Sequence, residues 1–340
     1  MGRYTALFIT AFTLLVIAFG SSMYLSKHVS EVKTVSTLPA ITVLTTLPAE
    51  NVAPLADEYE KNHKIKVVFV PLTEDELAKR VTDTGKADLV LTNSHMLNRI
   101  AGNGWLVPHI SETGDSVWDG LKDQNGFWTG VWYDPVVFCI NYDYAVRQES
   151  LPMSWQELAD RKDIRIGMTD FLAADASANI LFTMISQYGE ENATKIFTKL
   201  HPKVVQYSKY LSTPVRMAGM GEVDVSIAVQ SEALRYINEE FPLTIAYPSE
   251  GTACTLTGTG ILLKSPNEEQ AKLFADWLQG DEAQLVLQKN NFYFMPTNRN
   301  TMAYKKMTGK NLVLFMPLVD LPKERKQELL DKWVKNTRLN

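Results

Sequence analysis

Short apolar runs alternate with amphipathic stretches along most of the chain beyond residue 40. The first run, 41–44, is rich in β-branched residues, and apolar side chains recur at helical spacing in the next segment, 48–62. The pattern predicts further strands at 64–70, 87–91, 136–141, 164–168, 204–207, 224–229 and 259–263. It predicts further helices at 73–84, 154–161, 177–188, 215–219, 267–278 and 282–289, with helical closing segments at 302–339. Such alternation indicates an α/β fold with mostly parallel sheets covered by helices.

The N-terminus carries the most hydrophobic stretch of the sequence. Arg3 precedes an uncharged segment that ends near residue 25, and the small residue Gly20 offers a cleavage point for an export signal. The same segment is long enough to cross a bilayer as an uncleaved anchor, which needs about 20 residues. Residues 1–25 are therefore expected to be a signal peptide or a membrane anchor, and residues 26–40 a tether. Either alternative places the body outside the cytoplasm.

Composition and charge narrow the possible functions. The chain has 340 residues, enough for roughly two domains. Its 34 Lys and Arg against 39 Asp and Glu leave a formal charge of -5, which does not favour nucleic-acid binding. The sequence has no nucleophile elbow, no phosphate-binding P-loop and no histidine pair at metal-binding spacing. We therefore expect a binding protein rather than an enzyme, without a cofactor or a metal site.

Six segments, in their order along the chain, resemble the type II solute-binding proteins of ABC importers, the group that includes ferric-ion, phosphonate, thiamine and polyamine binders. The likeness covers about residues 41 to 300. The segments are ITVLTTLPAENVAPLADEYEKNHKIKVVFV, GKADLVLTNSHMLNRIAGNGWLVP, WYDPVVFCINYD, LPMSWQELAD, MGEVDVSIAV and SPNEEQAKLFADWLQGDEAQ.

This resemblance implies a monomeric receptor of two lobes, each a mostly parallel sheet flanked by helices, joined by two hinge crossings. Lobe 1 would comprise 41–137 and 256–300, and lobe 2 would comprise 138–255 and 301–340. The lobes would close over a small-molecule ligand by hinge motion, and the protein would deliver that ligand to an ABC permease. A ligand-sensing protein anchored in the membrane and signalling to a histidine kinase is the alternative, because the leader could remain uncleaved.

Candidate ligand contacts follow the ends of the predicted strands. Ligands of open α/β sheets bind at the carboxyl ends of strands, which favours Thr45, Thr46, Asn93 and Ser94 on topology alone. The resemblance extends the expected set to Trp132, Tyr133, Asp170, Ser177, Ser212, Thr213, Arg216, Gln230 and Ser231. Hydroxyl groups and free N–H groups at helix starts are suited to small anions.

The expected ligand is a polar organic molecule or an oxyanion. Ferric-ion members of the resembled family present two adjacent tyrosines shortly after the Gly-Glu segment, whereas Gln230, Ser231 and Glu232 stand at about that place here. A phosphonate, a phosphate ester or a sugar derivative is therefore favoured, with ferric ion as the alternative. Arg216 or Arg235 could supply charge to such an anion, although each could equally be an exposed helix residue.

The two cysteines, Cys139 and Cys254, give one further hypothesis. If 136–141 and 254–257 are the two crossing strands and lie side by side, these cysteines come within disulfide range in an oxidising compartment. Two protonated thiols near the hinge are the alternative.

Overall fold

The computed structural model describes residues 39–307, 312–316, 318 and 320–339, and Ala40–Asn340 form one compact unit. The predicted leader, 1–25, and nearly all of the predicted tether lie outside the described residues. Within the described part, we find no helix that combines the length and the apolar character needed to span a membrane.

The strands form one sheet in the order β2-β1-β3-β10-β5-β8-β6-β7. Beside this path, β4 pairs with β10, and β9 and β11 pair with β5. Their bounds are β1 (Ala40–Thr45), β2 (Lys66–Pro71), β3 (Leu89–Asn93), β4 (Leu106–Val107), β5 (Thr129–Asn141), β6 (Ile166–Thr169), β7 (Val204–Ser208), β8 (Val225–Val229), β9 (Leu243–Ala246), β10 (Cys254–Leu262) and β11 (Met295–Pro296).

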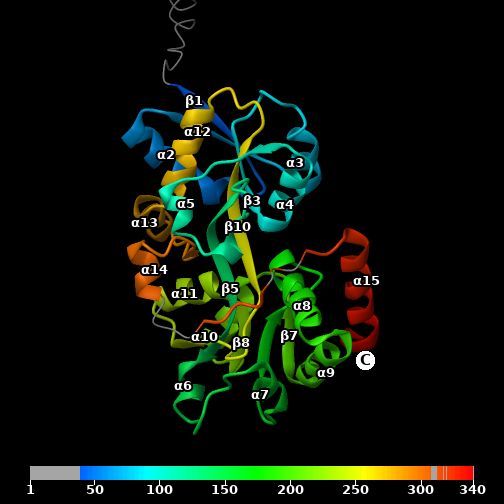
Figure 1. The fold of residues 1–340 in the computed structure, drawn as a ribbon. Helices are drawn as coiled ribbons and strands as arrows, with labels where there is room; N and C mark the ends of the chain where they lie inside the picture. The colour runs from blue at the N-terminus through cyan, green and yellow to red at the C-terminus, as the bar shows by residue number, and fades with distance from the viewer. Residues whose placement is uncertain (1–38, 308–311, 317, 319, 340) are drawn as a thin grey trace, which may run out of the picture. The chain divides into compact units, whose positions relative to one another are not determined.

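Strand β5 divides the sheet into two halves (Figure 1). Its first part pairs antiparallel with β10 and β11, and its second part pairs antiparallel with β8 and β9. The three strands β1, β2 and β3 are parallel, as are β6, β7 and β8. Each half is thus mostly parallel, as the sequence predicted. The residue boundaries predicted for the two lobes stay predictions.

Helices cover both faces of each half. Their bounds are α2 (Ala49–His63), α3 (Glu74–Arg80), α4 (Ser94–Gly102), α5 (Glu112–Asp115), α6 (Tyr142–Ala145), α7 (Trp155–Asp160), α8 (Asp175–Tyr188), α9 (Glu190–Leu200), α10 (Ser212–Gly219), α11 (Gln230–Asn238), α12 (Glu268–Leu278), α13 (Asp281–Lys289), α14 (Met302–Met307) and α15 (Lys323–Trp333), with short helical turns at Asp119–Leu121, His201–Lys203 and Val334–Arg338. Successive residues of β1 point to opposite faces of the sheet and so enter different cores. Val43 packs against α2 and α12, whereas Leu44 packs against α3 and α4. In the other half, α7, α8 and α9 cover one face, and α10 and α11 cover the other.

Part of the C-terminal region differs from the prediction of helical closing segments at 302–339. Residues 312–316 between α14 and α15 are extended rather than helical. The N–H of Thr252 donates to the carbonyl of Val313 (3.0 Å), and the N–H of Phe315 donates back to the carbonyl of Thr252 (2.9 Å). This segment therefore satisfies its backbone groups against a distant loop, a pairing that local periodicity does not report.

The predicted disulfide is wrong, because the register of the two crossing strands keeps the cysteines apart. Cys254 pairs with Pro135, whereas Cys139 pairs with Ser226 and Ile245 further along β5. Four strand residues span about 13 Å, well beyond the Cα separation of about 4.4–6.8 Å that a disulfide allows. Both thiols are free and buried, and burial raises the pKa of each to about 12. The structure therefore agrees with the alternative hypothesis, in which Cys139 and Cys254 are two protonated thiols.

Candidate ligand-binding cleft

A cleft of about 430 Å³ opens at the helix starts that follow β2, β3 and β6. Its walls are the first turns of α3 and α4 from one half of the sheet and the first turns of α8 from the other. Strand β10 contributes Cys254, Thr255 and Leu256, and α15 contributes Lys323 and Lys326. Figure 1 shows α4 above α8 beside β10. This volume suits a small organic ligand.

The first turn of α4 is built to present backbone donors. Asn93, at the end of β3, caps the helix: its Oδ1 accepts the N–H of Met96 (2.9 Å), and its Nδ2 donates to Glu74 (2.7 Å). Among the described residues, no acceptor satisfies the N–H groups of Ser94 and His95. Free amides at a helix start attract an anion.

The first turn of α8 offers the same chemistry from the other half of the sheet. Its N-cap, Ala174, supplies no side-chain hydrogen bond. The N–H groups of Ser177 and Ala178 donate to the carbonyl of Ala174, whereas those of Asp175 and Ala176 have no acceptor in the described structure. Two helix starts therefore open to one cleft, whose lining includes the free amides of Ser94 and His95 in α4 and of Asp175 in α8.

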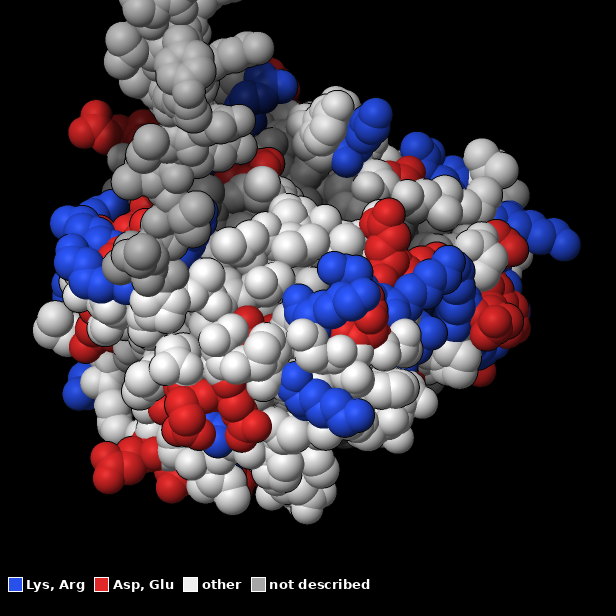
Figure 2. All heavy atoms as spheres, turned by 90° about the horizontal axis from the view of Figure 1, so that it is seen from above, with Lys and Arg blue, Asp and Glu red and all other residues white. Residues whose placement is uncertain are grey.

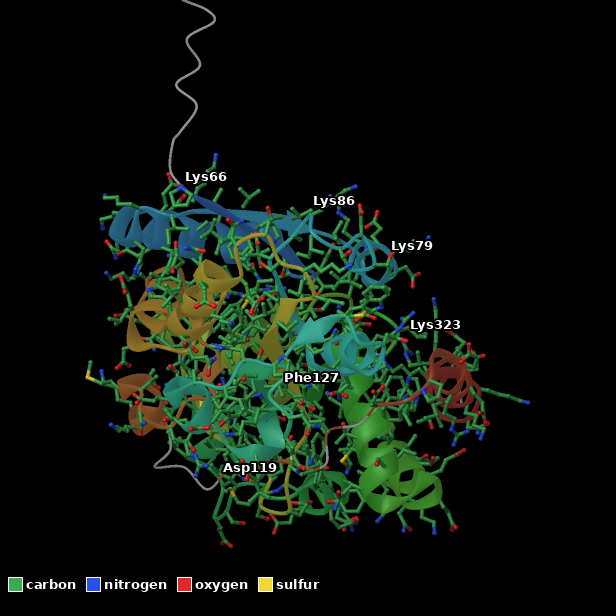
Figure 3. All side chains as sticks on the ribbon, turned by 45° about the horizontal axis from the view of Figure 1, so that its top comes forward. Lys66, Lys79, Lys86, Asp119, Phe127 and Lys323 are labelled. Atoms are coloured by element: carbon green, nitrogen blue, oxygen red, sulfur yellow. The ribbon has the colours of Figure 1, made fainter. Side chains whose placement is uncertain are left out.

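Basic side chains complete the cleft. Lys323 lies 3.8 Å from Asp75, but in the described part of the chain no carboxylate lies within ion-pair distance of Arg99 or Lys326. Figure 3 shows Lys323 at the start of α15, on the same side of the molecule as Lys79 of α3. Over the face seen in Figure 2, acidic and basic side chains are interleaved, without the broad basic surface that a nucleic-acid backbone requires.

A carboxylate on the central strand borders the cleft. Asp134 of β5 pairs with Thr255, which lines the cleft. Its Oδ1 accepts the N–H of Ser231 (2.9 Å), and its Oδ2 accepts the hydroxyl of Ser231 (2.5 Å). Burial raises the pKa of Asp134 to about 7, although the two hydrogen bonds from Ser231 act in the opposite direction. Asp134 thus joins the start of α11 to the strand that crosses between the halves.

A larger cavity, of about 570 Å³, lies elsewhere on the molecule, between α7 and α9. Its lining comes from helix flanks, from Tyr188 at the end of α8 and from Glu250. It lies at no carboxyl end of a strand. The smaller cleft between α4 and α8 is therefore the better candidate site.

The profile of the family described as bacterial extracellular solute-binding protein matches residues 43–293. This chain belongs to that family. The solute-binding protein is 24% identical over 264 residues to iron uptake protein A1 of Synechocystis sp., covering 71% of this chain and 72% of the relative.

Two solved structures share the fold of this solute-binding protein. One is the periplasmic binding protein AfuA from Actinobacillus pleuropneumoniae with fructose-6-phosphate bound (TM-score 0.67, 22% identity, 89% of this chain and 99% of that one). The other is iron-bound HitA from Pseudomonas aeruginosa (TM-score 0.66, 20% identity, 86% of this chain and 99% of that one). The predicted fold, that of a two-lobed periplasmic binding protein, and the predicted solute-binding function are confirmed.

The structure of the solute-binding protein brings two predicted contacts, Asn93 and Ser94, into the cleft. Ser231 does not line it, but it bonds to Asp134, the strand partner of the cleft residue Thr255. Thr45 is fully buried, with its hydroxyl oxygen accepting the N–H of Leu47 (3.0 Å). The hydroxyl of Thr46 shares a hydrogen bond of 2.7 Å with that of Thr92. Neither threonine lines the cleft.

Two predicted aromatic contacts pack in the core instead. Trp132 is buried and stacks on Phe294 at 5.7 Å between ring centroids. Tyr133 is buried among Leu256, Met295 and their neighbours, and it faces a different cavity. Both belong to β5, where alternate side chains enter opposite faces of the sheet, so a strand position alone did not show which face receives ligand.

The predicted contacts after β6, Asp170 and Ser177, form hydrogen bonds within the protein. Asp170 accepts the N–H of Leu172 (3.0 Å) and the Nε–H of Arg338 (3.2 Å). The hydroxyl of Ser177, which is buried, donates to the carbonyl of Asp170 (2.7 Å). These contacts order the loop that leads into α8. They support the cleft rather than line it.

The other predicted contacts lie outside the cleft lining. Ser212 and Thr213 begin α10, and the exposed Arg216 on that helix donates to the sulfur of Met220 (3.4 Å). Gln230 is buried and accepts the hydroxyl of Tyr247 (2.6 Å). Arg235, the other proposed cation, is paired with Glu232 (2.6 Å).

Sequence reasoning missed Arg99, Lys326 and Asp134. A signal existed only for Asp134, because it is the one carboxylate in the mostly apolar strand TGVWYDPVVFCIN. As for metals, no group of three or more His, Cys, Asp or Glu side chains in the described ranges could hold an ion.

Proposed function

We propose that this protein captures a small anionic organic solute in the cleft between α4 and α8 and delivers it to an ABC permease. One observation carries the proposal: two helix starts, one from each half of the sheet, open their free amides to a cleft that also holds Arg99 and Lys326. Amides at helix starts and unpaired cations both favour negative charge. An anion held by both halves would stabilise the closed arrangement and so drive hinge closure.

The ligands of similar proteins differ, so the cleft itself must decide the ligand class. AfuA is described with fructose-6-phosphate and HitA with iron. At the place where the ferric-ion binders of the resembled family carry two tyrosines, Gln230 is bonded to Tyr247 and Ser231 to Asp134. Neither side chain is a phenolate, the hard oxygen ligand that ferric ion prefers. This arrangement favours an organic anion over ferric ion.

The proposal also covers location and reaction class. A carrier of this kind works outside the cytoplasm and performs no chemistry on its ligand. Residues 1–25 would act as a cleaved export signal or would hold the body at the membrane, and the body would act as a monomer. The predicted contacts that line or border the cleft, Asn93, Ser94 and Ser231, would take part in binding.

A thermal-shift screen tests the proposal. The compact unit is produced from Ser36 onward, unfolded and refolded to remove carried ligand, and then tested with fructose 6-phosphate, phosphonates, inorganic phosphate and ferric citrate. A ligand at 100 times its Kd should add about 2.7 kcal/mol to the free energy of unfolding. We expect a saturable rise in Tm with an organic anion. A rise with ferric citrate alone would show that the ligand class is wrong.

Substitution of Arg99 tests whether the anion binds in this cleft. Arg99→Gln should weaken binding of the anion at least ten-fold, because the guanidinium lines the cleft without a carboxylate partner in the described chain. Arg80→Gln, on the exposed end of the neighbouring α3, removes the same charge outside the cleft and should leave the affinity within two-fold. Equal losses in the two variants would indicate a general charge effect rather than a contact at this site.

A further inference from the structure

The C-terminal arm, defined as residues 312–339, crosses the molecule in front of β5 and β10 (Figure 1). The structure describes 312–316, 318 and 320–339 of this arm. Phe315 is buried against Gly251, where a Cβ would lie 2.6 Å from the phenylalanine ring. Gly251 also has a φ of +122°, which side-chain-bearing residues rarely adopt. Glycine at this position therefore lets the arm pack directly onto the loop that precedes β10.

One end of the arm is anchored in the half of the sheet that carries α8. Leu329 and Trp333 of α15 are buried in the core formed with α8 and α9. Glu190, the first residue of α9, pairs with Lys332 of α15 (2.7 Å). Arg338 pairs with Asp170 (3.2 Å), at the carboxyl end of β6. This part of the arm is fixed mainly by buried aromatic and aliphatic surface.

The other end of the arm contacts the half that carries α3 and α4. Leu318 packs on the core that includes Leu97 and Leu256. The carboxylate of Asp320 contacts Nδ1 of His95 in α4. Lys323 faces Asp75 of α3 at 3.8 Å. The arm thus contacts both halves and closes one side of the cleft, where Lys326 joins Arg99.

The charged side chains that line the cleft differ in whether another side chain of the protein contacts them. Glu74 accepts a hydrogen bond from Asn93, and Asp75 faces Lys323. Among the charged side chains of the described cleft, Arg99, Lys326 and Asp175 have no such partner. Arg99 and Lys326, together with the free amides of Ser94, His95 and Asp175 at the cleft lining, can bind an anionic group, and the lone carboxylate of Asp175 accepts hydrogen bonds from ligand hydroxyls.

We propose that the C-terminal arm is a third wall of the ligand cleft and that Lys326, acting together with Arg99, selects a doubly charged head group on a hydroxyl-bearing molecule. The chemical class is a phosphate monoester of a polyol or sugar. This inference rests on the proposed function and adds to it a specificity-determining residue outside the segment that matches the family. Lys326 supplies the second positive charge, which a monoanion such as a carboxylate does not need.

The test compares two anions of similar size at pH 8, fructose 6-phosphate and gluconate. A phosphate monoester is mostly a dianion at this pH, because its second pKa is about 6. We expect the wild-type compact unit to bind fructose 6-phosphate at least ten-fold more tightly than gluconate. Lys326→Gln should reduce this ratio to within three-fold, and Lys326→Arg, which keeps the charge, should retain it.

Lys332→Gln is the matched control. It removes one positive charge from the same helix, where Lys332 pairs with Glu190 rather than lining the cleft. The selectivity ratio should stay unchanged. An undiminished ratio in Lys326→Gln, with Tm and circular dichroism showing a folded protein, would overturn the role of Lys326 and leave the proposed function intact. Failure of the wild type to bind either anion would instead overturn the proposed function, and this inference with it.

Discussion

Replacement of Trp155 by alanine is expected to lower the free energy of unfolding by about 3–5 kcal/mol. The side chain is fully buried in the core formed with α8 and α9. It contacts Phe138 edge-on at 5.0 Å between ring centroids, and its indole N–H donates to the carbonyl of Gly251 (3.0 Å). Alanine would leave a cavity and an unpaired buried carbonyl at the loop that supports the C-terminal arm.

Urea unfolding of the compact unit, followed by circular dichroism, measures this loss. Trp118→Ala is the control, because that side chain is 44% exposed and its removal leaves little cavity. The control should lose less than about 1.5 kcal/mol, consistent with a partly exposed position. A loss below about 1 kcal/mol in Trp155→Ala would mean that this core is not packed as described.

Asp134→Asn is expected to remove a large pH-dependent term from the stability. Burial raises the pKa of Asp134 to about 7 from an ordinary value of 3.8. Between those pH values the folded protein keeps the proton and the unfolded chain releases it. The folded state therefore binds more protons, and the free energy of unfolding falls as the pH rises. The contribution is absent below pH 4 and fully unfavourable above pH 7.

The measurement is urea unfolding of the wild type and of Asp134→Asn between pH 4 and pH 8. The free energy of unfolding of the wild type, relative to the variant, should fall by about 1.4 kcal/mol per pH unit, reaching a total of about 3–4 kcal/mol. Asp143→Asn, an exposed change on α6, controls for the loss of a carboxylate. A relative stability that rises with pH would show that the hydrogen bonds from Ser231 outweigh burial and hold the carboxylate ionised.

Local features of the fold could be predicted from the sequence. The alternation of strands and helices from residue 41 to residue 91 follows the apolar periodicity, and the Thr73 and Glu76 spacing forms the expected capping box. Asn93 and Ser94 reach the cleft because they end a parallel strand and begin a helix, a placement that topology alone dictates. In these cases the residues that form the sequence pattern lie within a few positions of the structural feature that they predict.

Features that depend on distant pairing could not be predicted in this way. The register that separates Cys139 from Cys254 is set by the hydrogen bonds between β5 and β10, two strands that lie far apart in the sequence. Residues 312–316 are extended and pair with Thr252, a residue distant in the sequence. Arg99 and Lys326 lie on helices as ordinary charged residues, and only the folding of the chain brings both to one cleft.

Amide hydrogen exchange, measured by mass spectrometry with and without fructose 6-phosphate, tests the central claim most directly, because it reports on the backbone donors themselves. The peptides of interest contain the free amides of Ser94 and His95 in α4 and those of Asp175 and Ala176 in α8. We predict that the anion slows exchange in both peptides at once. Slowing confined to the starts of α10 and α11, with α4 and α8 unchanged, would contradict the assignment of the cleft.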